Sequence, residues 1–205
     1  MQLQNADLIA HFIDHCERRV GHPMGAQDRS FTQRHFQAVR VKKAAFLIRA
    51  GEVPQQLAFT VAGLLRCFQI DWEGREITKH FCSEGSFCSS YGALISGQES
   101  RLFIQALEDC VVLQAPYRVI AATIHHNPFF LLLMKRCLED IVLHKETREE
   151  ELLAYNAQER YTRFLRQYPQ IEARVTNEHI ASYLGITPES LSRIRKNLRG
   201  LPIGK

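Results

Sequence analysis

The sequence lacks long hydrophobic runs. Its longest uninterrupted apolar run, residues 128–134, is far shorter than the roughly 20 residues that cross a bilayer. It also lacks an apolar leader, because Asp7, His11 and Asp14 stand where a signal peptide would have its hydrophobic stretch. We therefore expect a cytoplasmic protein without a membrane partner.

Paired cysteine motifs are absent as well. The six cysteines stand at positions 16, 67, 82, 88, 110 and 137, and no two have Cys-x-x-Cys spacing. That spacing is typical of zinc ribbons and redox dithiols, so neither is indicated. Cys16 alone cannot supply the N-terminal cysteine cluster of an iron–sulfur protein. In a reducing compartment such cysteines are usually small buried apolar residues, and we expect no metal site.

The composition is that of an ordinary globular chain. Apolar residues make up 45% and charged residues 23% of the 205 residues, which excludes collagen-like, low-complexity and wholly disordered proteins. The net charge of +4 is unevenly placed: residues 155–205 carry nine basic and four acidic residues, whereas the first 154 carry 17 and 18. A basic C-terminal quarter favours a polyanionic partner.

The hydrophobic period changes along the chain. Residues 1 to about 40 have helical spacing, and a second short helix is expected to begin near Asp28 or Ser30, either of which could cap it. Residues 44–115 form short β-prone runs separated by turn signals, with six of the eleven glycines between 51 and 97. Such spacing predicts a β-sandwich or barrel.

A long helix is predicted over residues 128–153. Some 25 residues span about 37 Å, which is more than a small β-domain needs to cover one face. We therefore expect the helix to pack against a second copy of the chain. The alternative is a helix packed only on its own domain. The apolar stripe expected to mediate the contact consists of Phe130, Leu133, Cys137 and Ile141.

Residues 175–198 predict a helix, a tight turn and a second helix. Thr176 or Asn177 can cap the first helix, and Gly185 stands at the turn, where a positive φ is cheap for glycine. Thr187 caps the second helix and Pro188 takes its first position. The inward residues are expected to be Ile180, Ala181, Leu184, Leu191, Ile194 and Leu198. The outward residues are expected to be Glu189, Ser190, Ser192, Arg193 and Lys196, with Arg195 and Arg199 alongside.

This arrangement is typical of a helix-turn-helix that reads DNA. The second helix of the motif enters the major groove, where arginine can bind guanine and glutamate can accept from cytosine. Basic residues further along neutralise phosphates. The alternative is a structural helical hairpin whose charged face is simply solvated.

The chain resembles the Crp/Fnr superfamily of bacterial transcription regulators over nearly its whole length. The most specific match is Tyr-Leu-Gly-Ile-Thr-Pro-Glu-Ser-Leu-Ser-Arg-Ile-Arg at 183–195, supported by residues 159–169 and 46–63. The resemblance implies an α+β fold with three parts. These are a double-stranded β-helix (jelly roll) effector domain with flanking helices at 1–127, a dimerisation helix at 128–153, and a winged-helix-like DNA-binding domain at 154–205.

The resemblance also implies residue roles and partners. The base-reading positions fall on Glu189, Ser192 and Arg193, an arrangement similar to that of the branch that reads TTGA-like half-sites. Pro188 replaces an arginine found in some members, and the wing after the second helix is expected to be short or missing. The implied partners are palindromic double-stranded DNA, a second copy of the chain and RNA polymerase. The phosphate contacts are expected to come from Thr187, Ser190, Arg195, Lys196 and Arg199.

The effector is not identified by the resemblance. The family's phosphate-binding cassette falls in residues 85–101, but its ribose-binding glutamate is missing and Arg101 comes one position late. Cyclic AMP binding in the usual manner is therefore not expected. Cys88 is placed as in a haem-sensing branch, but no histidine follows it within the cassette. The candidate effector pocket consists of Ser89, Ser90, Ser100 and Arg101.

Two rival functions remain. One is a ligand-binding sensor module whose incomplete DNA-binding domain does not bind DNA specifically. The other is a cupin-type enzyme, which would need two or three histidines on facing strands. Only His80 lies in the predicted β-region, so we expect no enzymatic activity.

Overall fold

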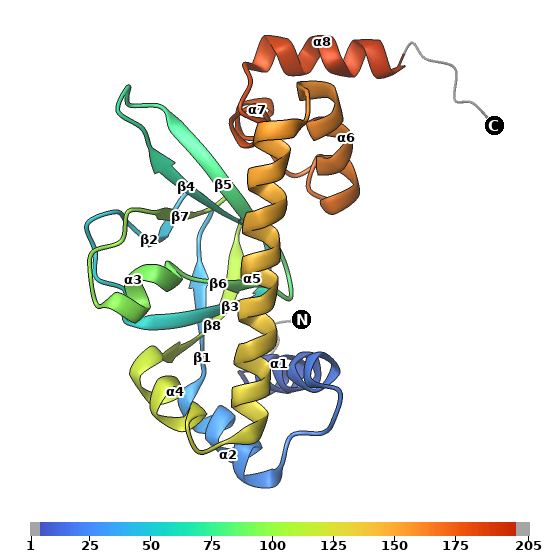
Figure 1. Ribbon diagram of the computed structural model, residues 1–205. Helices are drawn as coiled ribbons and strands as arrows, with labels where there is room; N and C mark the ends of the chain where they lie inside the picture. The colour runs from blue at the N-terminus through green and yellow to red at the C-terminus, as the bar shows by residue number, and fades with distance from the viewer. Residues whose placement is uncertain (1–4, 200–205) are drawn as a thin grey trace, which may run out of the picture. The chain divides into compact units, whose positions relative to one another are not determined.

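The computed structural model describes residues 5–199 and has the expected α+β fold (Figure 1). The helices are α1 (Asn5–Val20), α2 (Ala26–His35), α3 (Tyr91–Ser96), α4 (Tyr117–Ile124), α5 (Pro128–Ala154), α6 (Ala157–Gln167), α7 (Asn177–Leu184) and α8 (Pro188–Arg199). The strands are β1 (Gln37–Val41), β2 (Phe46–Ile48), β3 (Gln56–Ala62), β4 (Leu65–Ile70), β5 (Glu76–Cys82), β6 (Phe87–Cys88), β7 (Phe103–Ala106) and β8 (Cys110–Pro116).

The chain divides into two compact units. The first contains the residues up to Cys67 together with residues 81–142, and the second contains residues 68–80 and the chain from Leu143 onward. The boundary thus falls within α5 and within the β4–β5 hairpin, because the first half of α5 packs on the β-domain. The division into an effector domain, a dimerisation helix and a DNA-binding domain, which we expected from the sequence, stays a prediction.

Eight strands form two four-stranded sheets in the first unit and the adjoining hairpin. The strand orders are β1-β8-β3-β6 and β2-β7-β4-β5. Strand β8 lies between β1 and β3 and is antiparallel to both, with Val112 opposite Val39 and Thr60. This two-sheet arrangement confirms the predicted sandwich.

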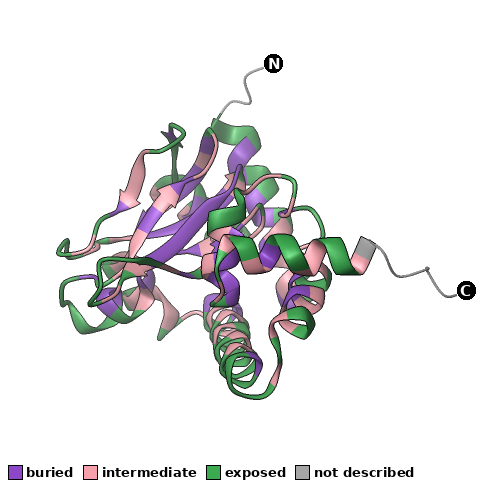
Figure 2. Ribbon diagram, turned by 90° about the horizontal axis from the view of Figure 1, so that it is seen from above, coloured by how far each residue is buried: buried purple, intermediate pink, exposed green. Residues whose placement is uncertain are grey.

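The alternation of side chains along β8 explains where the core lies. Cys110 and Val112 point into an apolar cluster shared by both sheets, whereas Leu113 and Ala115 belong to a second cluster with α1 and the start of α5. Successive side chains of a strand point to opposite faces, so one strand can serve both clusters. Figure 2 shows the resulting band of buried residues along the strands.

Helix α2 begins earlier than the sequence suggested. Its N-cap is Gly25, which makes no side-chain capping bond, and the Arg29 amide already donates to the Gly25 carbonyl at 2.9 Å. The prediction that Asp28 or Ser30 caps this helix is therefore wrong. The carboxylate of Glu17 accepts from the Met24 amide at 2.7 Å, which orders the chain just before the helix.

Helix α5 runs for 27 residues as one continuous helix. Helix α6 follows after a capping box formed by Asn156 and Glu159, which satisfies the first backbone amides of α6. Among residues 5–199, no helix is both long enough and apolar enough to cross a membrane.

Candidate DNA interface and effector region

The helix-turn-helix forms as predicted. Thr176 caps α7, its Oγ1 accepting from the His179 amide at 3.3 Å, so the choice between Thr176 and Asn177 falls on Thr176. Gly185 adopts the left-handed conformation with φ 67°, and the Ile186 amide closes the turn on the Ala181 carbonyl at 3.0 Å. A side chain at position 185 would be strained, which explains the glycine.

The inward face of the motif is tightly packed. Ile180, Leu184 and Leu191 have no exposed surface, and Ala181 is 1% exposed. Phe164 of α6 is also buried, and its ring lies 5.5 Å from that of Tyr183. This core sets the opposite side of α8 outward.

The three predicted base readers lie on the outward side of α8. Glu189, Ser192 and Arg193 are all exposed, and Figure 2 shows exposed and partly buried residues alternating along α8. The Ser192 hydroxyl donates to the Pro188 carbonyl at 3.0 Å, and the Arg193 guanidinium donates to Ser190 Oγ at 3.1 Å. The helix's own amide and the Thr187 hydroxyl lower the pKa of Glu189, which keeps it a hydrogen-bond acceptor.

The residues predicted to contact phosphate differ in their structural positions. Thr187 caps α8, since its Oγ1 accepts from the Ser190 amide at 3.3 Å, and the Thr187 hydroxyl also lies 3.2 Å from Ser190 Oγ. Lys196 is exposed, as a phosphate contact requires. The side chain of Arg199 and the expected wing, residues 200–205, lie outside the described part of the chain.

Arg195 has a structural position rather than a free one. Its guanidinium donates to the Tyr161 hydroxyl at 3.0 Å and pairs with Glu172 at 2.9 Å, and Tyr161 in turn donates to Glu172. A third bond reaches Asn177 Oδ1. These partners hold Arg195 against α6, the segment before α7 and the first residue of α7, and its phosphate contact stays a prediction.

The four predicted effector residues differ in exposure and in their hydrogen bonds. Ser100 is 2% exposed, and its hydroxyl is used in a local turn with the backbone of Leu102. Ser89 donates to the Gln56 carbonyl at 3.1 Å, and Ser90 is the buried residue before α3. Arg101 is exposed and lies in a bend before β7, outside any strand.

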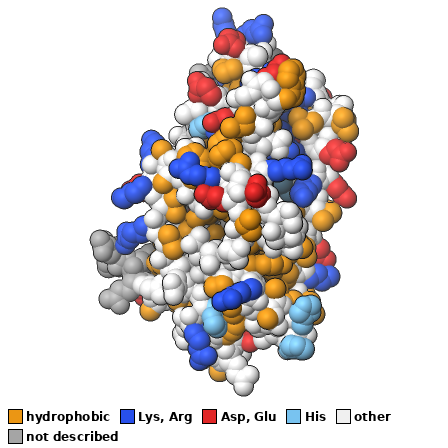
Figure 3. Space-filling model, turned by 90° about the vertical axis from the view of Figure 1, so that its left-hand side faces the viewer, with side chains coloured by type: hydrophobic (Ala, Val, Ile, Leu, Met, Phe, Trp, Pro, Cys, Tyr) orange, Lys and Arg blue, Asp and Glu red, His pale blue; other side chains and the backbone are white. Residues whose placement is uncertain are grey.

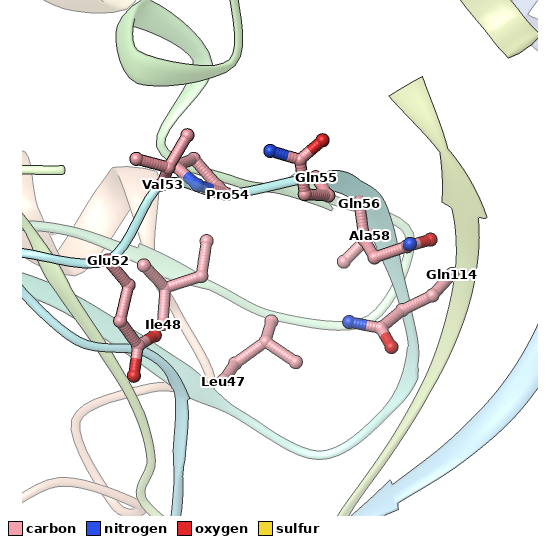
Figure 4. A pocket seen from close by; sticks show the side chains of 9 residues that line it. All are labelled: Leu47, Ile48, Glu52, Val53, Pro54, Gln55, Gln56, Ala58 and Gln114. Carbon is pink, nitrogen blue, oxygen red and sulfur yellow. The ribbon is translucent and has the colours of Figure 1, made fainter. Parts of the chain in front are cut away.

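A small cavity of about 180 Å³ lies beside these residues in the first unit (Figure 4). Figure 4 shows glutamine side chains at one end and Glu52 at the other. Its volume is below the roughly 300–1,000 Å³ of typical ligand pockets. A nucleotide would therefore fit only if the loop between β2 and β3, which lines the cavity, moved. The cavity is lined by Leu47, Ile48, Glu52, Val53, Pro54, Gln55, Gln56, Ala58 and Gln114.

The long helix presents a different apolar stripe from the one expected. Phe130 and Leu133 are buried in the core of the first unit, and Cys137 packs against the same core. Ile141 is half-buried. This packing matches the alternative in which the predicted stripe faces its own domain, because those side chains lie on the inner side of α5. The exposed large apolar residues of α5 are Leu131, Leu138, Val142, Leu143, Leu152 and Leu153.

Three cysteines lie close together in the structure, although the sequence did not predict that they form a group. Cys67, Cys82 and Cys88 are buried as expected, but their sulfur atoms lie within 4.8 Å of one another. They stand on three strands, β4, β5 and β6. No spacing motif signals such a group, because strand pairing rather than sequence distance brings the thiols together.

The surface seen in Figure 3 is mixed in character. Basic and acidic side chains are interspersed with hydrophobic ones on this face, so it lacks the uniform positive field that favours a polyanion.

Comparisons with known proteins agree with this fold. Residues 38–127 match the profile of the cyclic nucleotide-binding domain. The chain is 22% identical over 162 residues to the cAMP-activated global transcriptional regulator CRP of Pasteurella multocida, spanning 74% of this chain and 78% of that protein. It is 26% identical over 165 residues to the fumarate and nitrate reduction regulatory protein of Vibrio cholerae, spanning 75% of this chain and 65% of the relative.

A solved structure of a related regulator has a similar fold. FixK2 from Bradyrhizobium japonicum superposes with a TM-score of 0.71 at 19% identity, covering 83% of this chain and 89% of that chain. The comparisons confirm the resemblance found in the sequence: residues 38–127 match a cyclic nucleotide-binding domain, and the chain has the fold of the Crp/Fnr family of transcription regulators.

Proposed function

We propose that this protein is a homodimeric, sequence-specific DNA-binding regulator of transcription that acts in the cytoplasm on palindromic sites and works with RNA polymerase. Its β-domain would sense an effector that remains to be identified. We propose no enzymatic activity, since the named relatives are transcription regulators.

The observation that carries the proposal is the two-sided character of α8. Leu191 is fully buried on one side, while Glu189, Ser192 and Arg193 are exposed on the other. A helix of this kind, held by a preceding helix and a tight turn, can place its outer face in a major groove. Arg193 can then donate to guanine O6 and N7, and Glu189 can accept from cytosine N4.

The dimer supplies the second half of a palindrome. Leu131, Leu138 and Val142 are spaced by seven and four residues, so they lie along one face of α5. This is the spacing of a coiled-coil seam, and a second copy of the same helix is the occupant that such a repeat fits.

The decisive experiment is selection of bound duplexes from a random pool, followed by affinity measurements on the enriched site. Arg193→Ala is expected to cost about 1–3 kcal/mol of binding and to relax specificity at one base pair. Lys196→Ala, as a matched control, is expected to weaken all sequences evenly and to reduce the salt slope by about one.

Failure of the selection would favour the alternative function. If no palindrome is enriched, with or without a panel of nucleotides and small metabolites, the chain is a sensor module without specific DNA binding. If Arg193→Ala binds selected and random duplexes as the parent protein does, Arg193 is not a base reader.

A further inference from the structure

The first unit contains a group of three buried thiols. Cys67 Sγ lies 3.8 Å from Cys82 Sγ and 3.8 Å from Cys88 Sγ. Cys67 and Cys88 have no exposed surface and Cys82 is 1% exposed. All six cysteines lie in the described residues, and none of them is in a disulfide there.

These three thiols come from both sheets and meet between them. Cys67 and Cys82 stand on β4 and β5 of one sheet, whereas Cys88 stands on β6 of the other. Their neighbours in the core are apolar side chains such as Leu65, Ile104 and Val112. The three sulfur atoms therefore lie within a largely hydrocarbon core that also contains Cys110.

The sulfur spacing fits coordination to one metal ion. Metal–thiolate bonds of about 2.3 Å place sulfurs about 3.8 Å apart around a tetrahedral ion and about 4.0 Å apart around a trigonal ion. The separations of Cys67 Sγ from Cys82 Sγ and from Cys88 Sγ, both 3.8 Å, match these values, and all three sulfur atoms lie within 4.8 Å of one another. Soft thiolate ligands select Cu(I) and Zn²⁺ among biological metals.

The number of ligands distinguishes these two ions. Among the described residues, the group that could hold a metal consists of the three cysteines and includes no histidine or carboxylate. Structural zinc sites almost always have four ligands. Cu(I), a closed-shell ion with no ligand-field preference, is stable with three thiolates in a plane. Full burial of the group leaves no solvent-facing side for a fourth ligand.

We propose that Cys67, Cys82 and Cys88 form a trigonal binding site for a single Cu(I) ion. Each thiol would release its proton to solvent as its Cu–S bond forms, and copper would remain monovalent throughout. Entry would use the edge strand β6, which has only two residues and pairs with β3 through Ala58 and Phe59 alone.

The site would connect metal binding to the effector region. Cys88 directly precedes Ser89 and Ser90, and α3 begins at Tyr91. A metal that ties β6 to the facing sheet would restrict this segment. The copper site itself is independent of the proposed DNA binding, whereas its use as a regulatory signal depends on it.

The test is anaerobic titration of the full chain with Cu(I) in competition with bathocuproine disulfonate. The parent protein is expected to hold one equivalent, with a thiolate-to-copper charge-transfer band and an X-ray absorption spectrum showing three sulfur ligands. Since loss of even an outer-shell partner costs about 10- to 100-fold in metal affinity, Cys67→Ala and Cys88→Ala are expected to lose at least about 100-fold.

Two control variants test whether the loss of copper affinity is specific to the three proposed ligands. Cys16→Ala and Cys110→Ala remove equally buried thiols outside the group and should retain the parent affinity. Circular dichroism establishes that each variant is folded. If Cys67→Ala is unfolded, the ligand count from the parent spectrum decides the question.

Three results would overturn the proposal. They are a parent protein that binds Cu(I) no more tightly than Cys67→Ala, a spectrum with fewer than three sulfurs, and tight Zn²⁺ binding without Cu(I) binding. A separate gel shift with and without Cu(I) tests the regulatory use. Failure of DNA binding in both conditions would count against the proposed function but not against the copper site.

Discussion

The backbone amide of Thr78 in β5 donates a hydrogen bond of 2.9 Å to the Ser182 hydroxyl in α7, 104 residues further along the chain. The same hydroxyl donates to the Glu76 carbonyl at 2.6 Å. One serine therefore holds the start of β5 against the helix-turn-helix within the second unit. This contact joins the β4–β5 hairpin to the helix-turn-helix.

Replacing Ser182 should loosen this contact. Thr78 is 2% exposed, so Ser182→Ala leaves a buried amide without its partner and is expected to lower the free energy of unfolding by about 1–2 kcal/mol. Urea unfolding measures the change. Ser30→Ala on the surface of α2 is the control. An equal stability for both variants would show that the contact contributes nothing.

Arg193 and Arg195 should have opposite phenotypes. Arg195→Ala leaves Glu172 and the Tyr161 hydroxyl without their cation and is expected to cost about 1–2 kcal/mol of folding free energy. Arg193→Ala, on the exposed face, is expected to change stability by less than about 0.5 kcal/mol while weakening operator binding. Thermal unfolding and gel shifts on the same preparations separate the two. Equal loss of stability in both would contradict the structural role of Arg195.

The exposed stripe of α5 should control dimerisation. Leu138→Glu introduces a charge into the proposed seam, and burying a leucine is worth about 1.5–3 kcal/mol, so the dimer dissociation constant is expected to rise at least about tenfold. Analytical ultracentrifugation over a concentration series measures it. Glu139→Gln, beside the seam, should leave the dimer intact. A monomeric parent protein would contradict the seam altogether.

His144 should make stability depend on pH. Burial, followed by the neighbouring His80 and Arg148, lowers the pKa of His144 to about 4. The rings of His80 and His144 lie 5.9 Å apart, and Gln167 Nε2 lies 3.1 Å from His144 Nδ1. Because the folded chain prefers neutral His144, its contribution is complete above the unfolded pKa near 6.5 and is lost as the pH falls toward 4.

The measurement compares unfolding free energies at about pH 7.5 and about pH 5. The parent protein should lose about 1–2 kcal/mol more than His144→Gln over this interval, after allowance for solvent screening. His126→Gln, an exposed histidine, should behave as the parent does. Parallel curves for the parent and His144→Gln would contradict the assignment.

Gly63 should tolerate no side chain. A Cβ there would lie 2.6 Å from Cys110 Sγ and 2.9 Å from the Asp109 carbonyl oxygen, and φ is +95°. Left-handed strain and overpacking together predict a loss of about 2–5 kcal/mol for Gly63→Ala. Gly74 has φ +80° with open space around its Cβ position, so Gly74→Ala should cost only about 1–2 kcal/mol. Urea unfolding that gives equal losses would show that packing at Gly63 is unimportant.

Local patterns in the sequence were sufficient for most of the fold. The Gly185 turn, the Thr187 cap and the inward position of Leu191 follow from backbone conformation and helical period, which are properties of neighbouring residues. The β-region and the long helix follow from hydrophobic period and length in the same way. These features could be predicted because each depends on a short stretch of chain.

Tertiary structure decided what depends on distant contacts. A basic residue's sequence position does not reveal a partner such as Glu172, so Arg195 could not be distinguished from Arg193 in advance. Either apolar stripe of α5 could face the core until the β-domain covered Phe130 and Leu133. The three thiols of Cys67, Cys82 and Cys88 meet only because two sheets pack face to face, and strand pairing across a fold leaves no trace in sequence spacing.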